Sequence, residues 1–496
     1  MKKYILEIVV FISGAVVMVF ELVGSRVLAP YVGTSTFVWT SLIGIILASL
    51  SVGYWLGGKL ADQRAEYKVL SWIIMLAAIL IGGQAFVKES VMILIQDSIT
   101  DIRWGSVVAA ITLFSLPSIL LGMVSPYAVK LKMKSLDKTG RTVGNLYAIS
   151  TTGSIVGTFS AGFFLIPWLG NTKILLLLAI ILIFCSGLVY LKKIWPLQII
   201  LVLIFIVSSL ITMPSPLDAK DNFIDLDTKY NRVWIYDAID SQTNQPIKTL
   251  QLNAESHSAR YLENDDLVFG YTKFYRLADY FVPELNSALM LGGAAYSYPQ
   301  DFLSHYDTAT IDVVEIDPVL TELAKQYFNL EDDPRLTSIH EDGRTYINNT
   351  DKKYDAILGD AFTSYYSVPY QLATVEAVAR IYDLLTENGV AIINIASAIE
   401  GPAGKFLRAE LATYREYFPQ VFIFPVSVPN SARSFQNIIM VAMKSDQAPN
   451  FMSTNPEYQE YLDHLWTEEV TGDMPVLTDD YAPVDYYINQ ALNEIY

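Results

Sequence analysis

Residues 287–317, which read SALMLGGAAYSYPQDFLSHYDTATIDVVEID, decide the fold of the second half of this chain. An apolar run at 287–291 ends in Gly292-Gly293, and another at 310–316 closes on Glu315 and is followed by Asp317. Short apolar runs of this length, separated by enough residues for a helix, are typical of buried parallel strands joined by a crossover. The stretch therefore predicts a strand, a crossover and a second strand.

The same alternation continues on both sides of this stretch. Downstream there is helical periodicity at 319–328, followed by short apolar runs at 336–340, 354–358, 390–395, 421–425 and 437–442. Such alternation predicts a doubly wound α/β domain with a mostly parallel sheet, whose last two strands form an edge pair. Upstream, residues 232–239 and 247–252 alternate apolar and polar side chains, which predicts a small antiparallel sheet.

The first half of the chain has a different pattern, with long apolar runs. About 20 helical residues cross a hydrocarbon core, and runs near that length lie at 4–31, 36–57, 69–87, 104–126, 145–168, 172–190 and 194–213. The number of these runs favours a multi-pass membrane protein over a single cleaved signal peptide. We expect three parts: a membrane bundle of about seven helices at 1–214, a small β subdomain at 215–280 and a Rossmann-like domain at 281–496.

The two halves carry opposite charge. Residues 1–214 hold 16 Lys and Arg against 8 Asp and Glu, whereas the remainder holds 18 against 43. The acidic second half excludes a basic nucleic-acid-binding surface. Cys185 is the only cysteine, so an internal disulfide or a cysteine-built zinc site is excluded. The four histidines lack ligand spacing, and we expect no metal site.

Lys and Arg in the short loops of the first half predict its orientation. They fall on alternate loops, which would all be cytoplasmic, and seven crossings would then place the second half on the outer face of a cell membrane. An error of one helix would reverse this conclusion. Glu21 and Arg26 lie inside the first apolar run, where ionisable groups either pair at an interface or line a polar cavity or substrate path.

Glycines and acids gather at the predicted strand ends. They are Gly292, Gly293, Glu315, Asp342, Gly343 and Asp360. Each is a weak signal alone, because an acid after a strand is often a helix cap. Together they predict a nucleoside site, in which Glu315 has the position of an acid that binds ribose hydroxyls. The acids suit a sulfonium or ammonium ligand, and the absence of a third glycine makes a bound dinucleotide the minor alternative.

Five motifs of the second half are similar to those of one family. They are Leu291-Gly292-Gly293, Val314-Glu315-Ile316-Asp317-Pro318, Glu341-Asp342-Gly343-Arg344, Tyr354-Asp355-Ala356-Ile357-Leu358-Gly359-Asp360-Ala361-Phe362 and Leu477-Thr478-Asp479-Asp480-Tyr481-Ala482-Pro483. The stretch from about 220 to 486 resembles the polyamine aminopropyltransferase (spermidine synthase) family in its membrane-fused form. The resemblance implies a class I methyltransferase-like (Rossmann-like) fold and an aminopropyl group moved from decarboxylated S-adenosylmethionine to an amine.

The resemblance also implies roles for individual residues. Gly292, Gly293, Glu315 and Asp317 would bind the donor, with Glu315 on the ribose, and Asp342 with Gly343 would meet the adenine. Asp360 would be the catalytic carboxylate beside the attacking amine. Side chains alternate between the two faces of a strand, so Asp355, five positions before Asp360, should point to the opposite face. The donor, S-adenosylmethionine or its decarboxylated form, would be a co-substrate, with no cofactor bound permanently.

The sequence departs from the family where the acceptor should bind. Ala295 and Thr363 stand where the family carries acids, and 253–257 replaces a turn that contains a glutamine. A buried dication without counter-charges is costly, so the acceptor may be an amine other than putrescine. The candidates for its site are His257, Tyr296, Tyr298, Tyr365 and Tyr366, whose rings suit a single cation, although tyrosines in a core serve packing equally well.

Three functions remain open on this evidence. The first is aminopropyl transfer to a small-molecule amine. The second is other chemistry on the same sulfonium, namely methyl transfer or elimination, and the third is a membrane sensor or carrier that binds without turnover. Expected partners are the amine and membrane lipid, with no nucleic acid, and a homodimer is an open alternative to a single copy. Because the adenosyl donor is made in the cytoplasm, an outer location would require passage of donor, acceptor or product across the bilayer.

Overall fold

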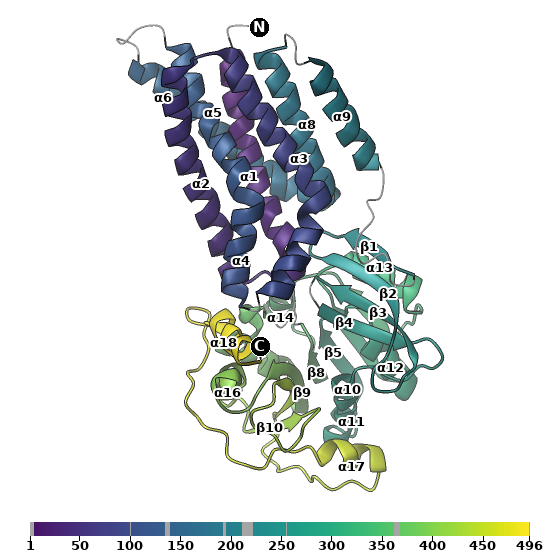
Figure 1. Cartoon of the computed structure of the whole chain (residues 1–496). Helices are drawn as coiled ribbons and strands as arrows, with labels where there is room; N and C mark the ends of the chain where they lie inside the picture. Colours follow the sequence, from purple (N-terminus) through teal and green to yellow (C-terminus); the bar gives the residue numbers. More distant parts are fainter. Residues whose placement is uncertain are drawn as a thin grey trace. The chain divides into compact units, whose positions relative to one another are not determined.

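The computed structural model describes residues 4–99, 101–133, 139–191, 195–210, 222–253, 255–361 and 368–495. The chain divides into two compact units (Figure 1). One consists of Met1–Ala219 with Leu226–Arg232, and the other of Lys220–Asp225 with Val233–Tyr496. Each unit is described separately below.

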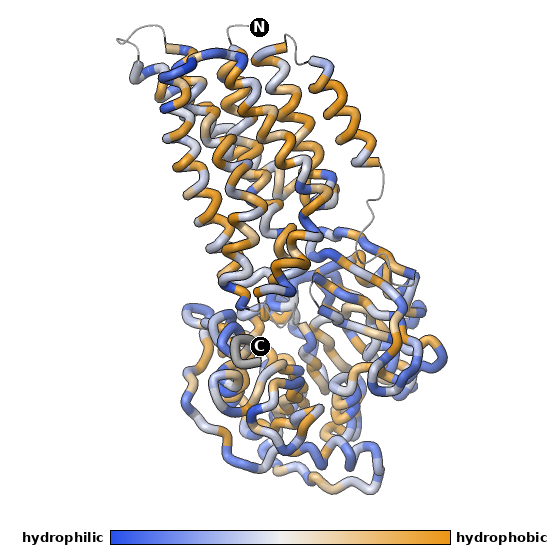
Figure 2. The backbone as a smooth tube through the Cα atoms, in the orientation of Figure 1, coloured by the Kyte–Doolittle hydropathy of each residue, from blue (hydrophilic) through white to orange (hydrophobic). Residues whose placement is uncertain are grey.

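The first unit is a helical bundle. Its helices are α1 (Ile5–Val32), α2 (Thr36–Gln63), α3 (Tyr67–Ser98), α4 (Ile102–Ala110), η1 (Ile111–Ser115), α5 (Leu116–Lys132), α6 (Thr139–Ser160), η3 (Ala161–Leu165), α7 (Ile166–Trp168), α8 (Asn171–Val189) and α9 (Trp195–Leu210). The π-helical turns η1 and η3 join their flanking helices into the continuous segments Ile102–Lys132 and Thr139–Trp168. Figure 2 shows the apolar character of these helices along most of their length.

Each of the seven expected apolar runs is helical over most or all of its described residues. Among the described residues, six helical segments are long and apolar enough to cross a membrane, and α9 is a shorter apolar helix of 16 residues. Helix α3 is longer than expected and continues through the semi-apolar stretch at 91–96 to Ser98. The chain is therefore supported as a membrane protein by six helices that meet the length criterion, rather than by seven.

Glycines let two pairs of these helices approach closely. A Cβ on Gly153 of α6 would lie 2.0 Å from the carbonyl oxygen of Phe11 in α1, and one on Gly122 of α5 would lie 2.8 Å from that of Leu50 in α2. Neither distance leaves room for a side chain, so these glycines serve helix packing.

The residues 226–232 belong to the helical unit because three polar contacts hold them there. Arg26 donates hydrogen bonds to the carbonyls of Thr228 and Lys229. Asn171, the first residue of α8, donates its backbone and side-chain N–H groups to Asp227. Arg232 pairs with Glu89 of α3 at 2.5 Å. Arg26 therefore has the interfacial role that was one of its two expected roles.

The second unit contains two sheets. The smaller has the order β1-β2-β3-β4, formed by β1 (Ile224–Asp227), β2 (Arg232–Ile239), β3 (Pro246–Leu252) and β4 (Glu255–Tyr261). Strands β2, β3 and β4 pair antiparallel, with a register shift between Leu250 and Gln251. The short helices α10 (Gly270–Lys273), η5 (Phe274–Arg276) and α11 (Leu277–Phe281) connect this sheet to the larger one.

The larger sheet has seven strands in the order β10-β11-β9-β8-β5-β6-β7. Its strands are β5 (Ser287–Leu291), β6 (Thr310–Val314), β7 (Leu336–Ile339), β8 (Tyr354–Gly359), β9 (Leu385–Ser397), β10 (Gln420–Pro425) and β11 (Gln436–Met443). The five strands from β7 to β9 are parallel, and β10 and β11 form an antiparallel edge. The expected doubly wound α/β class and its edge pair are confirmed.

The helices of this unit follow the strands in the expected alternation. They are α12 (Ser297–His305), α13 (Pro318–Tyr327), α14 (Gly343–Asn349), η6 (Tyr370–Leu372), α15 (Val375–Leu384), η7 (Pro402–Gly404), α16 (Lys405–Tyr414), α17 (Pro456–Leu462) and α18 (Val484–Ile495). The chain runs from β5 outward to β7 and then returns to β8 on the other side of β5. This reversal creates a switch point between the carboxyl ends of β5 and β8, where open α/β sheets bind their ligands.

Candidate active site

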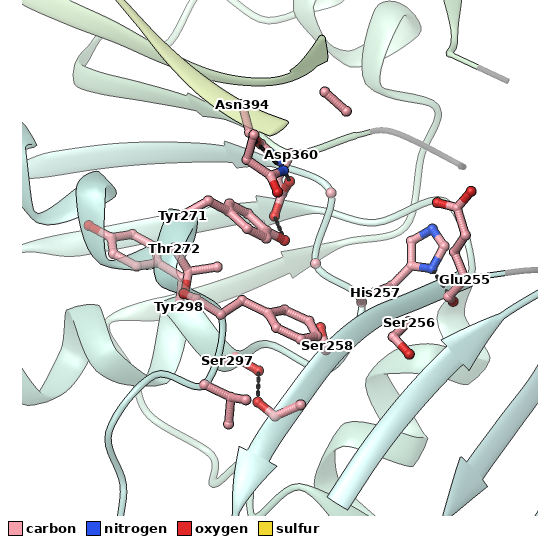
Figure 3. Close-up of a pocket in the computed structure, with 18 of the residues that line it drawn as sticks. Glu255, Ser256, His257, Ser258, Tyr271, Thr272, Ser297, Tyr298, Asp360 and Asn394 are labelled. Atoms are coloured by element: carbon pink, nitrogen blue, oxygen red, sulfur yellow. Dashed lines mark hydrogen bonds between the residues drawn. The ribbon is translucent and has the colours of Figure 1, made fainter. Parts of the chain in front are cut away.

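A cavity lies at this switch point (Figure 3). Its polar lining comes from Glu255, Ser256, His257, Ser258, Tyr271, Thr272, Ser297, Tyr298, Asp360, Asn394 and Asn437. Strand β4 provides one wall, and the ends of β5, β8, β9 and β11 provide the other. Among the described residues that line it there are two carboxylates and no Lys or Arg, so the cavity favours cationic ligands.

Asp360 follows β8 directly and faces this cavity. Its backbone N–H donates to the carbonyl of Leu291, which ties it to the end of β5. One carboxyl oxygen accepts from the hydroxyl of Tyr271 at 3.1 Å and the other from the amide of Asn394 at 3.2 Å. Burial raises the pKa of Asp360 to about 6, and these hydrogen bonds oppose the rise. A carboxyl with this pKa suits a base that works near neutral pH.

Asn394 is itself held in place by the edge of the sheet. Its side-chain oxygen accepts from the amide of Asn437 on β11 at 3.0 Å, and its nitrogen is thereby directed at Asp360. The sequence offered a signal for this residue, because Asn394 is a polar side chain within the buried apolar run 390–395. Tyr271 and Asn437 offered none, since their approach to Asp360 and Asn394 depends on the tertiary fold.

Gly292 permits the close approach of the glycine loop to Asp360. Its φ is +95°, and a Cβ there would lie 2.5 Å from the carbonyl oxygen of Asp360. Only glycine fits both conditions. Gly292, Gly293 and Ala294 all line the cavity, whereas Ala295 is fully buried and donates its backbone N–H to Ser258.

Glu315 lies behind the glycine loop and does not line the cavity. One oxygen of its carboxyl accepts from the backbone N–H groups of Gly293 and Ala294, both at 3.0 Å, and the other accepts from that of Asp317 at 2.9 Å. Burial raises the pKa of Glu315, and the three hydrogen bonds oppose this. In this structure Glu315 braces the loop, and its contact with a ribose remains a prediction.

Asp317 and Asp342 act as helix caps. Asp317 is fully buried and accepts from the backbone N–H of Val319 at the start of α13. Asp342 accepts from the backbone N–H and hydroxyl of Thr345 at the start of α14. Neither lines the cavity, and Gly343 is the first residue of α14. Asp317 thus follows the carboxyl end of β6, and Asp342 and Gly343 follow that of β7, and both strands lie on the other side of β5 from β8.

The expected acceptor residues separate into three groups. His257 lines the cavity, and its Nδ1 lies 2.8 Å from the carbonyl oxygen of Glu255. Tyr296 does not line it, and its expected substrate-binding role stays a prediction. This residue has a φ of +60°, which turns its ring into the core, where its hydroxyl bonds to that of Thr321 at 2.9 Å. Tyr365 and Tyr366 lie outside the described residues.

Comparison with known proteins bears on this geometry. Residues 275–452, which include the glycine loop and Asp360, match the family described as spermine/spermidine synthase domain. Over this segment the chain is similar to that family. This finding confirms the resemblance seen in the motifs.

Three similar proteins illustrate the match. The polyamine aminopropyltransferase of Vibrio vulnificus is 32% identical over 164 residues, which cover 32% of this chain and 52% of that protein. The N-terminal histidine N-methyltransferase of Emericella nidulans is 32% identical over 179 residues, which cover 35% and 31%. The structure of a probable spermidine synthase from Corynebacterium glutamicum aligns with a TM-score of 0.41 at 21% identity, covering 50% of this chain and 88% of that one. The chain spans about half the length of the curated aminopropyltransferases it matches.

Proposed function

We propose that the second unit transfers an aminopropyl group from decarboxylated S-adenosylmethionine to an amine. The observation that carries this proposal is Asp360, a carboxyl with a pKa of about 6 that faces a cavity at the switch point, in the segment that matches the spermine/spermidine synthase domain. The described residues that line this cavity include no Lys or Arg. The names of the similar aminopropyltransferases support the same reaction class. The donor enters as a co-substrate and leaves as methylthioadenosine.

The proposed reaction is a single displacement at carbon. The lone pair of the acceptor nitrogen forms a bond to the aminopropyl carbon attached to sulfur, and the carbon–sulfur bond breaks with its electron pair going to sulfur. Asp360 holds the amine in line and accepts the proton that the nitrogen releases. Tyr271 and Asn394 fix the orientation of this carboxyl through their hydrogen bonds. Gly292 lets the glycine loop lie against the backbone carbonyl of Asp360.

Glu315 retains capacity for a ribose hydroxyl. An ionised carboxylate accepts about four hydrogen bonds, and Gly293, Ala294 and Asp317 donate three. One acceptor position therefore remains for the donor, next to the glycine loop. We further propose that Asp342 and Gly343 meet the adenine, since they end the loop after β7 on the same edge of the sheet.

The test is product analysis with purified full-length protein. Incubation with decarboxylated S-adenosylmethionine and candidate amines should yield methylthioadenosine and an aminopropylated amine, detected by mass spectrometry. Asp360→Asn should abolish turnover and leave nucleoside binding largely intact. Asp355→Asn on the same strand is the control, because Asp355 lies at the far end of β8 and accepts hydrogen bonds from Asn286 and Ser287. Full turnover by Asp360→Asn would remove this residue from the mechanism.

Methyl transfer is a second candidate, supported by the similarity of 35% of the chain to the N-terminal histidine N-methyltransferase of Emericella nidulans. The same cavity and the same base would serve a methyl group of S-adenosylmethionine. Release of S-adenosylhomocysteine in the assay would identify this reaction. Nucleoside binding without any product would instead indicate a sensor or carrier.

We also propose that the helical unit spans a cell membrane and that the second unit lies on its outer side. Six segments meet the length requirement, and the basic loops assign the N-terminal end to the cytoplasm. Sidedness then depends on whether α9 crosses as well. The contacts of residues 226–232 with the helical unit support a crossing.

A further inference from the structure

One motif of the second unit has no role in the reaction as proposed so far. It is Leu477-Thr478-Asp479-Asp480-Tyr481-Ala482-Pro483. Its backbone lies along the start of α15, because the N–H of Val375 donates to the carbonyl of Leu477. The backbone N–H of Asp479 donates to the carboxylate of Glu376 in the first turn of the same helix. The motif is thereby anchored beside residues 368–374, the segment that leads into α15.

The carboxylate of Asp479 joins this motif to two other parts of the unit. One oxygen accepts from the guanidinium of Arg344 at 2.8 Å, and the other accepts from the hydroxyl of Thr374 at 2.7 Å. Arg344 is the second residue of α14. Its guanidinium also donates to the hydroxyl of Thr374 at 2.8 Å and to the carbonyl of Gln371 at 2.7 Å. We call the three side chains of Arg344, Thr374 and Asp479 the clamp.

The clamp is shielded from solvent on the side of Thr374. This residue is fully buried, and the side chain of Arg344 is 15% exposed, against 48% for Asp479. An exposed ion pair contributes little alone. Here the pair shares a buried hydroxyl that both donates and accepts, so removal of the Asp479 charge leaves polar groups of low exposure without a partner. The relative position of the joined segments therefore depends on Asp479.

The clamp fixes the segment 368–374 against the start of α14. Gly343 directly precedes Arg344, and a Cβ on Gly343 would lie 3.5 Å from the side chain of Leu372. Leu372 lines a second pocket together with Leu291, the residue before Gly292. Val368 lines both this pocket and the cavity that Asp360 faces. The segment thus borders the proposed adenine position on one side and the cavity on the other.

We infer that Arg344 and Asp479 are positioning residues that hold the segment 368–374 against α14 and thereby set the width of the adenine subsite. This inference rests on the proposed aminopropyl transfer, in which Asp342 and Gly343 meet the adenine. Neither positioning residue is among the described residues that line the cavity. The clamp therefore acts on the adenosine part of the donor and leaves the amine and the chemical step unaffected.

The test measures binding of methylthioadenosine, which carries the adenosine of the donor. In Asp479→Asn, the Kd of methylthioadenosine and the KM of the donor should both rise by about tenfold, because a charge-assisted contact is lost. The KM of the amine and kcat at saturating donor should stay unchanged. Arg344→Lys keeps the charge without the planar fork and should give a smaller rise. Asp480→Asn is the matched control, since Asp480 is the neighbouring exposed acid of the same motif.

A further variant and a binding measurement by calorimetry keep the outcomes distinct. If Asp479→Asn does not fold, Thr374→Val removes both hydroxyl contacts with little change in size. An unchanged Kd of methylthioadenosine in the clamp variants would overturn the inference, and so would its failure to bind the unaltered protein. Equal rises in the KM of donor and amine would also overturn it, because general loss of structure produces that result. Absence of turnover with every donor and amine would overturn the proposed function, whereas methylthioadenosine binding would still decide the role of the clamp.

Discussion

At the residue scale, the pKa of Asp360 reflects two opposing influences. Burial raises it, and the hydrogen bonds from Asn394 and Tyr271 favour the charged form and lower it. The proton can be accepted only by the ionised carboxylate. Activity should therefore increase as the pH rises through about 6 and fall away below it.

Asn394→Ala tests this balance. Without the amide, the charged form of Asp360 loses a hydrogen bond, so its pKa rises and the acid limb of the kcat/KM profile moves to higher pH. The profile of the unaltered protein with the same amine serves as the reference, because ionisation of the amine affects both profiles equally. An acid limb at the same pH in both proteins would show that Asn394 does not act on the ionisation of Asp360.

The sequence predicts some site residues better than others for a local reason. Gly292 and Asp360 end apolar runs, and the end of a buried strand can be located from its run alone. To predict Asn394, one must know which face of β9 meets Asp360. To predict Glu255, one must know the position of a separate sheet. The φ of +60° at Tyr296 is unusual for a bulky residue, and no periodicity indicates that its ring turns into the core.

At the scale of elements, the glycine loop and the carboxyl end of β8 meet through their backbones. Gly292→Ala would place a Cβ 2.5 Å from the carbonyl oxygen of Asp360, at a φ of +95° that side chains rarely adopt. We expect a loss of stability of about 1–3 kcal/mol and a fall in turnover of at least about tenfold, because the displaced loop moves Asp360.

Thermal unfolding and turnover of the purified variant check this prediction. Gly472→Ala is the control, since an added Cβ there meets no atom within 4 Å. Unimpaired turnover by Gly292→Ala would mean that the loop tolerates a side chain and that the close contact has no catalytic role.

Some strands and helices are longer than the apolar runs that predict them. Strand β9 was expected at 390–395 but begins at Leu385, because the polar stretch at 386–388 interrupts the apolar run without ending the extended conformation. Helix α3 extends to Ser98 through a segment whose buried residues, Met92 and Ile95, lie on one face. Hydrophobic runs identify the buried centre of an element, whereas its polar ends depend on neighbours.

At the scale of the whole molecule, the change from long to short apolar runs near residue 214 predicts the helical and α/β halves. It does not predict that residues 226–232 return to the helical unit, which depends on side chains distant in sequence. Arg26, Glu89 and Asn171 make the contacts that hold them. Charge alone could not identify these partners.

Those contacts bear on the path of α9 through a membrane. Arg26 lies near the end of the first span, Glu89 lies late in the third, and Asn171 begins the sixth. If the first span starts in the cytoplasm, all three positions lie toward the outer side. Residues 226–232, which contact them, lie on that side too, whereas the basic loop before α9 is assigned to the cytoplasm. Helix α9 must then cross, although its 16 described residues span only about 24 Å at 1.5 Å each.

Cysteine labelling in intact cells tests the resulting prediction that the second unit is outside. Cys185 is fully buried in α8, so the unaltered chain should give little background with an impermeant thiol reagent. Glu263→Cys on the exposed surface of the second unit should be labelled in intact cells, and Arg64→Cys in the basic loop after α2 only after permeabilisation. The reverse pattern would place the second unit in the cytoplasm, beside the source of its donor. An outer location instead requires that the donor, which is made inside, crosses the bilayer, so a labelled Glu263→Cys would make the helical unit the first candidate for that passage.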